Sequence, residues 1–166
     1  MNYLKKIYEK LLSTDISLLR YCVQAFVIAI IPSLVMTMGA LLIAEIFSVN
    51  IETPKKIVMD FKVFLSLVVF APLFETFILA FLIYFIQTFF KTKAIIFTSI
   101  LISFIFGVIH GLNTSIQFLG TFWTFFVIST TYIAWRKHGF RHAYFAALIP
   151  HSLLNLTAFI LMRLTN

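Results

Sequence analysis

The sequence predicts an all-α fold, a polytopic bundle of about five transmembrane helices. The 166 residues are 61% hydrophobic and only 11% charged, and their mean hydropathy of +1.03 lies outside the range of ordinary soluble domains. The apolar residues form long runs between short charged clusters and lack the ten-residue alternation of a membrane β-barrel. Helices are the remaining form in which such runs satisfy their backbone polar groups within lipid.

Residues 1–20 predict an amphipathic cytoplasmic segment that precedes the membrane domain. No cleavage site follows promptly, so this segment does not resemble a removed signal peptide. It carries charges of both signs, on Lys5, Lys6, Glu9, Lys10, Asp15 and Arg20. The rest of the chain, 21–166, is predicted to be a single transmembrane domain.

Charged and polar residues divide this domain into five apolar segments, each compared with the ~20 residues that a bilayer helix needs. The dividing stretches are residues 50–62, the lysine pair Lys91 and Lys93, the sequence NTSIQ (113–117) and the sequence RKHGFRH (136–142). The segments run over residues 21–49, 63–90, 94–112, 118–135 and 143–164.

Prolines predict a break in two of these segments. At 1.5 Å per residue, segment 63–90 would be roughly 42 Å long, against a hydrocarbon core of about 30 Å. Pro72 offers a break point there, and Pro150 offers one in the last segment, since proline disrupts a helix interior. Freed backbone groups beside polar residues are typical of binding sites in membrane helices.

The net charge of +7 predicts a membrane orientation and not nucleic-acid binding, because the basic residues flank the apolar segments. With the N-terminus in the cytoplasm, nine Lys and Arg residues lie inside, in residues 1–20, at 91–93 and at 136–142. Four lie outside, namely Lys55, Lys56, Lys62 and Arg163. This excess of positive charge on one side is what the positive-inside rule describes.

An acidic residue, Glu75, lies three residues after Pro72 inside an apolar segment. Inserting an acid there costs about 2.5–3.5 kcal/mol, whereas each Leu, Ile or Phe returns about 0.3–0.6 kcal/mol. An ionisable residue within the membrane predicts a functional site. The structural alternative is a glutamate that packs against a Ser, Thr or Tyr of another helix.

Two other segments each carry a histidine paired with a residue four positions away, a spacing that places each pair on one helical face. The pairs are Phe106 with His110 and His151 with Asn155. Their structural alternatives are an interfacial histidine at 110 and an interhelical hydrogen-bonded pair at 151 and 155, worth about 0.6 kcal/mol. Together with Glu75, these residues supply a carboxylate that can accept a proton from water and donors that can hold an oxyanion.

The depths of these residues differ when they are counted along their own segments. His110 lies near the outer end of its segment, Glu75 lies deeper and His151 lies near mid-span. We therefore expect the breaks at Pro72 and Pro150, or a third helix that continues into NTSIQ, to bring the three side chains level.

The ordered set Pro-x-x-Glu, Phe-x-x-x-His and His-x-x-x-Asn over consecutive apolar segments resembles the CPBP intramembrane protease family. This family, also called Abi, includes CAAX prenyl endopeptidases and bacteriocin-processing or bacteriocin-immunity proteins. The resemblance covers about residues 63–160. It implies an endopeptidase of the bacterial cytoplasmic membrane that hydrolyses a peptide bond in a membrane-associated peptide or protein.

The resemblance also implies roles for the residues. Glu75 would activate the hydrolytic water with help from His110, while His151 and Asn155 polarise the scissile carbonyl and stabilise its oxyanion. Phe106 would support them. We favour a glutamate-type mechanism that requires no cofactor, although this carboxylate and these imidazoles are also ligand types for zinc. The implied partners are membrane lipid and a peptide or membrane-protein substrate, with no nucleic acid.

The chain departs from the family pattern at two positions. The family's first motif has a second glutamate and, after three residues, an arginine, and these are Thr76 and Ala80 here. Losing an acid and a base together leaves no unpaired charge, and Thr76 can still donate a hydrogen bond that positions Glu75. The departure leaves open a second function, that of a catalytically weak protein that binds a bacteriocin or another partner and confers immunity. A third function, ion transport, is disfavoured by the few spans and the absence of an inverted repeat.

Overall fold

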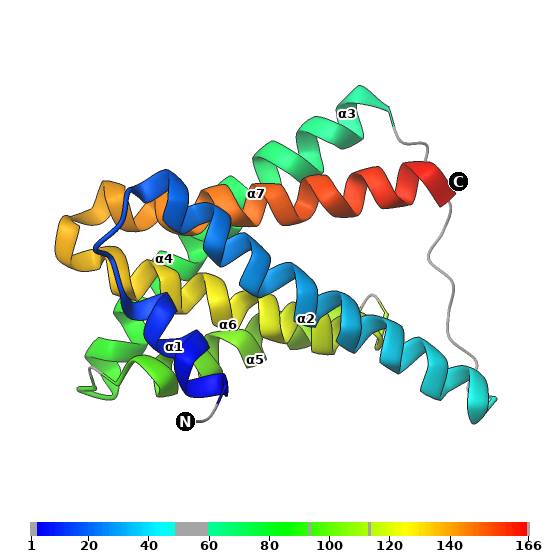
Figure 1. Ribbon diagram of the computed structural model, residues 1–166, viewed down its shortest axis with the longest axis horizontal. Helices are drawn as coiled ribbons and strands as arrows, with labels where there is room; N and C mark the ends of the chain where they lie inside the picture. Colours follow the sequence, from blue (N-terminus) through cyan, green and yellow to red (C-terminus); the bar gives the residue numbers. More distant parts are fainter. Residues whose placement is uncertain (1–2, 49–59, 93, 113, 166) are drawn as a thin grey trace.

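The structure, a computed structural model, describes residues 3–48, 60–92, 94–112 and 114–165, and every regular element within these ranges is a helix (Figure 1). The all-α prediction is therefore confirmed. Lys55, Lys56, Lys93 and most of the predicted polar stretch 50–62 lie outside the described residues. In chain order the elements are α1 (Tyr3–Leu12), α2 (Leu18–Ile46), α3 (Phe61–Phe64), the π-helix η1 (Leu65–Phe70), α4 (Ala71–Phe89), α5 (Ile95–Gly111), α6 (Gln117–Trp135), the 3₁₀-helix η2 (Arg136–His138) and α7 (Phe140–Thr165).

Among the described residues, four helices are long and apolar enough to cross a membrane, so the protein is integral to a membrane. Because α3, η1 and α4 follow one another without interruption, they form one span, Phe61–Phe89. The other three spans are Leu18–Ile46, Gln117–His138 and Phe140–Leu164. The remaining apolar segment forms α5, which is shorter, with 17 residues.

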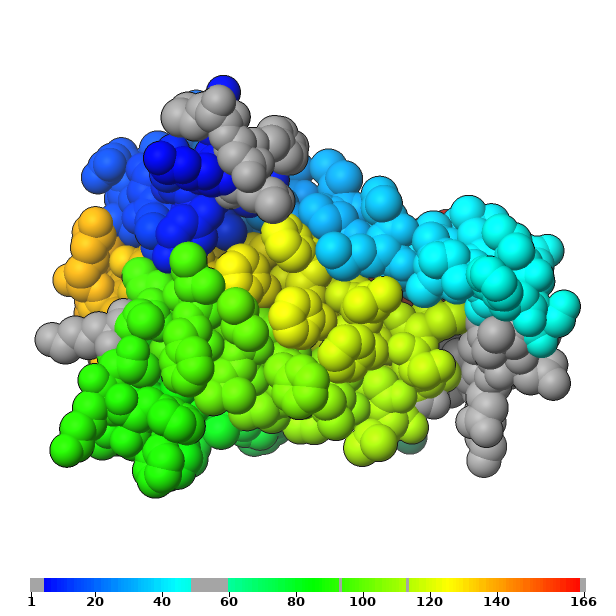
Figure 2. Space-filling view, turned by 90° about the horizontal axis from the view of Figure 1, so that it is seen from below, coloured from blue at the N-terminus to red at the C-terminus, as the bar shows by residue number. Residues whose placement is uncertain are grey.

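Helix α6 lies at the centre of the bundle. It packs against α5, α2 and α7, while α4 packs mainly on α7. Figure 2 shows α5, α6 and α2 side by side on one face of the molecule. Residues 127–132 of α6 are all buried, whereas Phe74, Phe77 and Phe81 of α4 are more than 60% exposed. Helix α4 therefore turns a broad aromatic face toward the lipid.

One end of the bundle holds α1, the α4–α5 turn and η2 (Figure 1). Leu11 of α1 is 1% exposed and accepts a hydrogen bond on its carbonyl from the Tyr21 hydroxyl. Thr14 Oγ1 lies 2.8 Å from Nε2 of His138, which ties the α1–α2 linker to η2. These contacts fasten the N-terminal helix to the end of the bundle.

The expected break at Pro150 is wrong, because α7 continues through this residue to Thr165. A proline has no N–H, so the carbonyl four residues back, that of Ala146, loses its helical donor. The thiol of Cys22 on α2 lies 3.9 Å from this carbonyl oxygen, within reach of a weak S–H hydrogen bond. A neighbouring helix thus satisfies the freed group, and α7 can continue.

Pro32 of α2 follows the same pattern. The carbonyl that it frees is that of Ile28, and Trp123 Nε1 on α6 donates to this oxygen over 2.9 Å. Helix α2 therefore also runs on without interruption, and the bond joins it to the central helix.

At Pro72 the helix continues as well, after a π-helical turn. The Ala71 N–H donates to the Ser66 carbonyl, five residues back. In this register the donor for the next carbonyl, that of Leu67, would be the nitrogen of Pro72, which carries no hydrogen. Asn155 Nδ2 on α7 donates to the Leu67 carbonyl over 2.9 Å. The expected break is therefore a widened turn within a continuous helix.

Gly120 lies at a close contact between α6 and α2. A Cβ built at this position would lie 2.8 Å from Thr37 Oγ1, and the Gly120 carbonyl accepts a 3.0 Å hydrogen bond from Ser33 Oγ. We expect Gly120→Ala to lower the free energy of unfolding by about 1–3 kcal/mol, because the extra methyl overpacks this contact. The measurement is equilibrium unfolding in mixed detergent micelles.

Gly39→Ala is the matched control for Gly120→Ala, since nothing lies within 4 Å of a Cβ at Gly39. We expect this control to be neutral or to stabilise α2 by about 0.5–1 kcal/mol, the helix preference for Ala over Gly. Equal destabilisation by both variants would contradict the close packing of α2 on α6.

Candidate active site

Glu75 and His110 come level because α4 and α5 form an antiparallel hairpin. Glu75 lies fourteen residues before the end of α4 at Phe89, and His110 lies fifteen residues after the start of α5 at Ile95. At 1.5 Å per residue both lie about 21–23 Å from the shared turn. Neither a broken helix nor a continuation of α5 into NTSIQ is needed to bring Glu75 and His110 to the same depth. The expectation that one of these would be required is therefore wrong.

The structure brings Glu75, His110 and His151 together from three helices. Glu75 Oε2 lies 3.4 Å from His151 Nε2 and 3.8 Å from His110 Nε2. The His151 side chain is 3% exposed, whereas those of Glu75 and His110 are 24% and 32% exposed. Oε2 is buried and has no hydrogen-bond partner among the described residues. One carboxylate oxygen therefore faces two imidazole nitrogens, with access from the side of Glu75 and His110.

Thr76 contacts the other nitrogen of His151. Its hydroxyl lies 3.4 Å from His151 Nδ1, and its side chain is fully buried. When this hydroxyl donates to Nδ1, the imidazole hydrogen must sit on Nε2, the atom that faces Glu75. Thr76 thus adjoins the site through His151, one residue from the glutamate.

Phe125 of α6 is a site residue that the sequence did not single out. Its ring stacks on Phe106 at a centroid distance of 3.9 Å and meets the His151 ring edge-on at 5.3 Å. The His110 ring lies 5.9 Å away. Phe125 therefore packs against both imidazole rings from the core side, and Phe106 packs against Phe125.

Asn155 lies one turn beyond His151, and its amide donates to the Leu67 carbonyl at the π-turn. This contact uses one of the two amide hydrogens. The proposed contact of Asn155 with an oxyanion stays a prediction. The structure shows a different contact for Asn155, a hydrogen bond to the span that carries Glu75.

We expect Asn155→Leu to lower the free energy of unfolding by about 1–2 kcal/mol, because the Leu67 carbonyl loses its donor. Amide exchange over residues 65–71 should accelerate in the same variant. Thr157→Val is the control, since the Thr157 hydroxyl donates only to Leu153 within α7. Equal effects of the two variants on residues 65–71 would refute the link between Asn155 and the π-turn.

Metal binding depends on how the donor groups are arranged. Among the residues that the structure describes, no group of three or more His, Cys, Asp or Glu side chains is arranged to hold a metal ion. Zinc requires imidazole nitrogens at about 2.0–2.1 Å and carboxylate oxygens at about 2.0–2.2 Å from the ion. If an ion bound at this site, Glu75, His110 and His151 would be its ligands. Whether the activity of the protein requires a metal ion can be tested directly.

A scan against protein-family models and searches of curated proteins and of solved structures find no match to this chain.

Proposed function

We propose that this protein is an intramembrane endopeptidase of the CPBP type that hydrolyses a peptide bond in a membrane-associated peptide or protein. The observation that carries the proposal is the approach of two imidazoles to one carboxylate oxygen, 3.4 Å and 3.8 Å away, inside a membrane bundle. A partly buried acid whose carboxylate oxygen has such neighbours matches the requirements of general-base catalysis.

In the proposed mechanism Glu75 takes a proton from a water molecule, and the water oxygen forms a bond to the scissile carbonyl carbon. The carbonyl electron pair moves to oxygen, where the Nε2 hydrogen of His151 stabilises the oxyanion. Asn155 is the second donor implied by the family pattern. His110, the more exposed imidazole, holds the water. The C–N bond then breaks, and Glu75 returns its proton to the leaving amine.

The N-terminus is proposed to lie in the cytoplasm of a bacterial cell. Helices α1 and η2 lie at the same end of the bundle (Figure 1). Their sequences are rich in Lys and Arg, as the positive-inside rule expects for a cytoplasmic side.

The second candidate is a membrane protein that binds a bacteriocin or another partner and confers immunity. It is favoured by one observation: Thr76 and Ala80, which replace the charged pair of the family pattern, are both buried and carry no charge. Such a protein would use the same bundle for binding alone.

The experiment that separates the two functions uses the reconstituted full chain in liposomes, mixed with a library of membrane-anchored peptides in water labelled with heavy oxygen. Mass spectrometry should find cleaved peptides whose new C-terminus carries one labelled oxygen atom. Intact peptides throughout, together with a peptide that stays bound to the protein, would favour the partner-binding function. Prior treatment with a chelator, followed by zinc addition, shows whether the activity depends on metal.

A further inference from the structure

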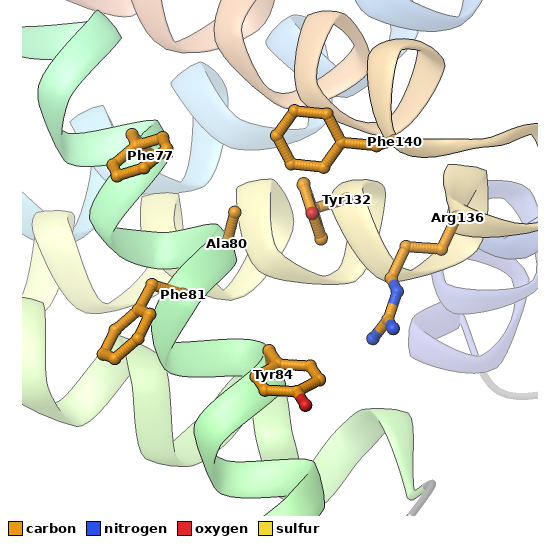
Figure 3. A pocket seen from close by; sticks show the side chains of 7 residues that line it. All are labelled: Phe77, Ala80, Phe81, Tyr84, Tyr132, Arg136 and Phe140. Atoms are coloured by element: carbon orange, nitrogen blue, oxygen red, sulfur yellow. The ribbon is translucent and has the colours of Figure 1, made fainter.

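A cavity of about 470 Å³ lies between α4, α6 and the start of α7, near the basic end of the bundle (Figure 3). Its volume falls in the range of sites for small molecules. None of Glu75, His110 and His151 lines it. The cavity is therefore separate from the candidate active site, and its occupancy does not depend on the proposed peptidase function.

The walls of the cavity are aromatic and open toward the lipid. Phe77, Phe81 and Tyr84 of α4 are all more than 60% exposed, and Tyr132 of α6 closes the inner side with 5% exposure. Ala80 lies between them, and because its side chain ends at Cβ the space stays free (Figure 3). An occupant that enters from this side comes from the bilayer and contributes a hydrocarbon chain.

The polar end of the cavity carries an unneutralised cation. Arg136 follows the last residue of α6, and its Nη1 donates to Gln87 Oε1 over 2.7 Å. Within the described part of the chain, no carboxylate lies in ion-pair distance of this guanidinium. That bond leaves four of the five N–H donors of Arg136 free, and the next residue, Lys137, is also basic. A phosphate matches this planar set of donors.

We propose that the cavity binds an anionic phospholipid, with its phosphate on Arg136 and an acyl chain along Phe77, Phe81 and Tyr84. The opening toward lipid and the position of the guanidinium at the end of a span favour this occupant over a soluble anion or an acidic peptide. Basic pockets between transmembrane helices on the cytoplasmic side bind anionic headgroups in the same manner.

The test uses the full chain in nanodiscs of phosphatidylcholine with phosphatidylglycerol, analysed by native mass spectrometry for lipid that stays bound. We expect phosphatidylglycerol to be retained in preference to phosphatidylcholine. Arg136→Gln should reduce this retention about fivefold, the effect of losing one charge contact worth about 1 kcal/mol. Ala80→Leu, which fills the cavity and keeps every charge, should reduce it as well.

Arg141→Gln is the matched control, because it removes the same charge from the same end of the bundle at a residue that does not line the cavity. It should retain phosphatidylglycerol as the unaltered protein does. Three results would overturn the proposal: equal retention of phosphatidylcholine, an equal loss in Arg141→Gln and Arg136→Gln, or displacement of the bound lipid by a soluble acidic peptide. If Ala80→Leu does not fold, the two arginine variants still decide the outcome.

Discussion

Replacing Glu75 by Gln is expected to reduce peptide hydrolysis by about 10²–10⁴-fold, the usual contribution of a general base. Gln keeps the shape of the side chain but cannot accept the proton of the attacking water. Its amide can still contact His151 and His110, which lie 3.4 Å and 3.8 Å from the present carboxylate oxygen. The measurement is the initial rate of labelled-peptide formation in liposomes, at equal amounts of folded protein.

Glu45→Gln is the control for this variant. Glu45 is an exposed residue near the end of α2, far along the chain from the three-residue cluster and without a contact to it in the described structure. It should keep the full rate. If the Glu75→Gln protein cleaves as fast as the unaltered protein, the peptidase proposal is refuted. Immunity or partner binding would then be the preferred function.

Truncating His151 to Ala is expected to lower the free energy of unfolding by about 2–4 kcal/mol. The variant leaves a cavity beside Phe125 and deprives both Glu75 Oε2 and the Thr76 hydroxyl of their imidazole neighbour. Hydrolysis should fall in the same variant, since the oxyanion loses a donor worth about 10²–10³-fold in rate. Unfolding in mixed detergent micelles and the liposome assay measure the two effects separately.

His110→Ala should behave differently, although it contacts the same carboxylate oxygen. Its side chain is 32% exposed, so water can replace the imidazole, and we expect less than about 1 kcal/mol of destabilisation. His142→Ala, at an exposed position of α7, should change neither stability nor rate. Equal destabilisation at 110 and 151 would contradict the burial that distinguishes the two histidines.

Helix positions could be predicted closely from the sequence, because hydrophobicity is the property that a bilayer selects. The expected segments 94–112 and 118–135 correspond to α5 (Ile95–Gly111) and α6 (Gln117–Trp135). The effect of the prolines could not be predicted. Whether a freed carbonyl breaks a helix depends on a donor from another helix, such as Cys22 for Pro150, and nothing local to a proline reveals that donor.

The candidate site was partly predictable. Glu75, His110 and His151 stand out because polar residues are rare in apolar segments, and the structure brings them together. Phe125 does not stand out among 21 phenylalanines. A signal for it exists in the hairpin geometry: it lies ten residues before the end of α6, and His151 lies eleven residues after the start of α7. Counting from the shared turn brings the two level, as it does for Glu75 and His110.

The shortness of α5 bears on the membrane itself. Its 17 residues extend about 25 Å, less than the hydrocarbon thickness of about 30 Å. A helix with such a mismatch draws the headgroups of the nearer leaflet inward and thins the bilayer around its end. That end carries His110 and faces away from the basic side of the bundle. Water would then reach Glu75 from the side of the membrane opposite the basic end of the bundle, where the bilayer is locally thinned. The lipid would thus form part of the path that water takes to the site.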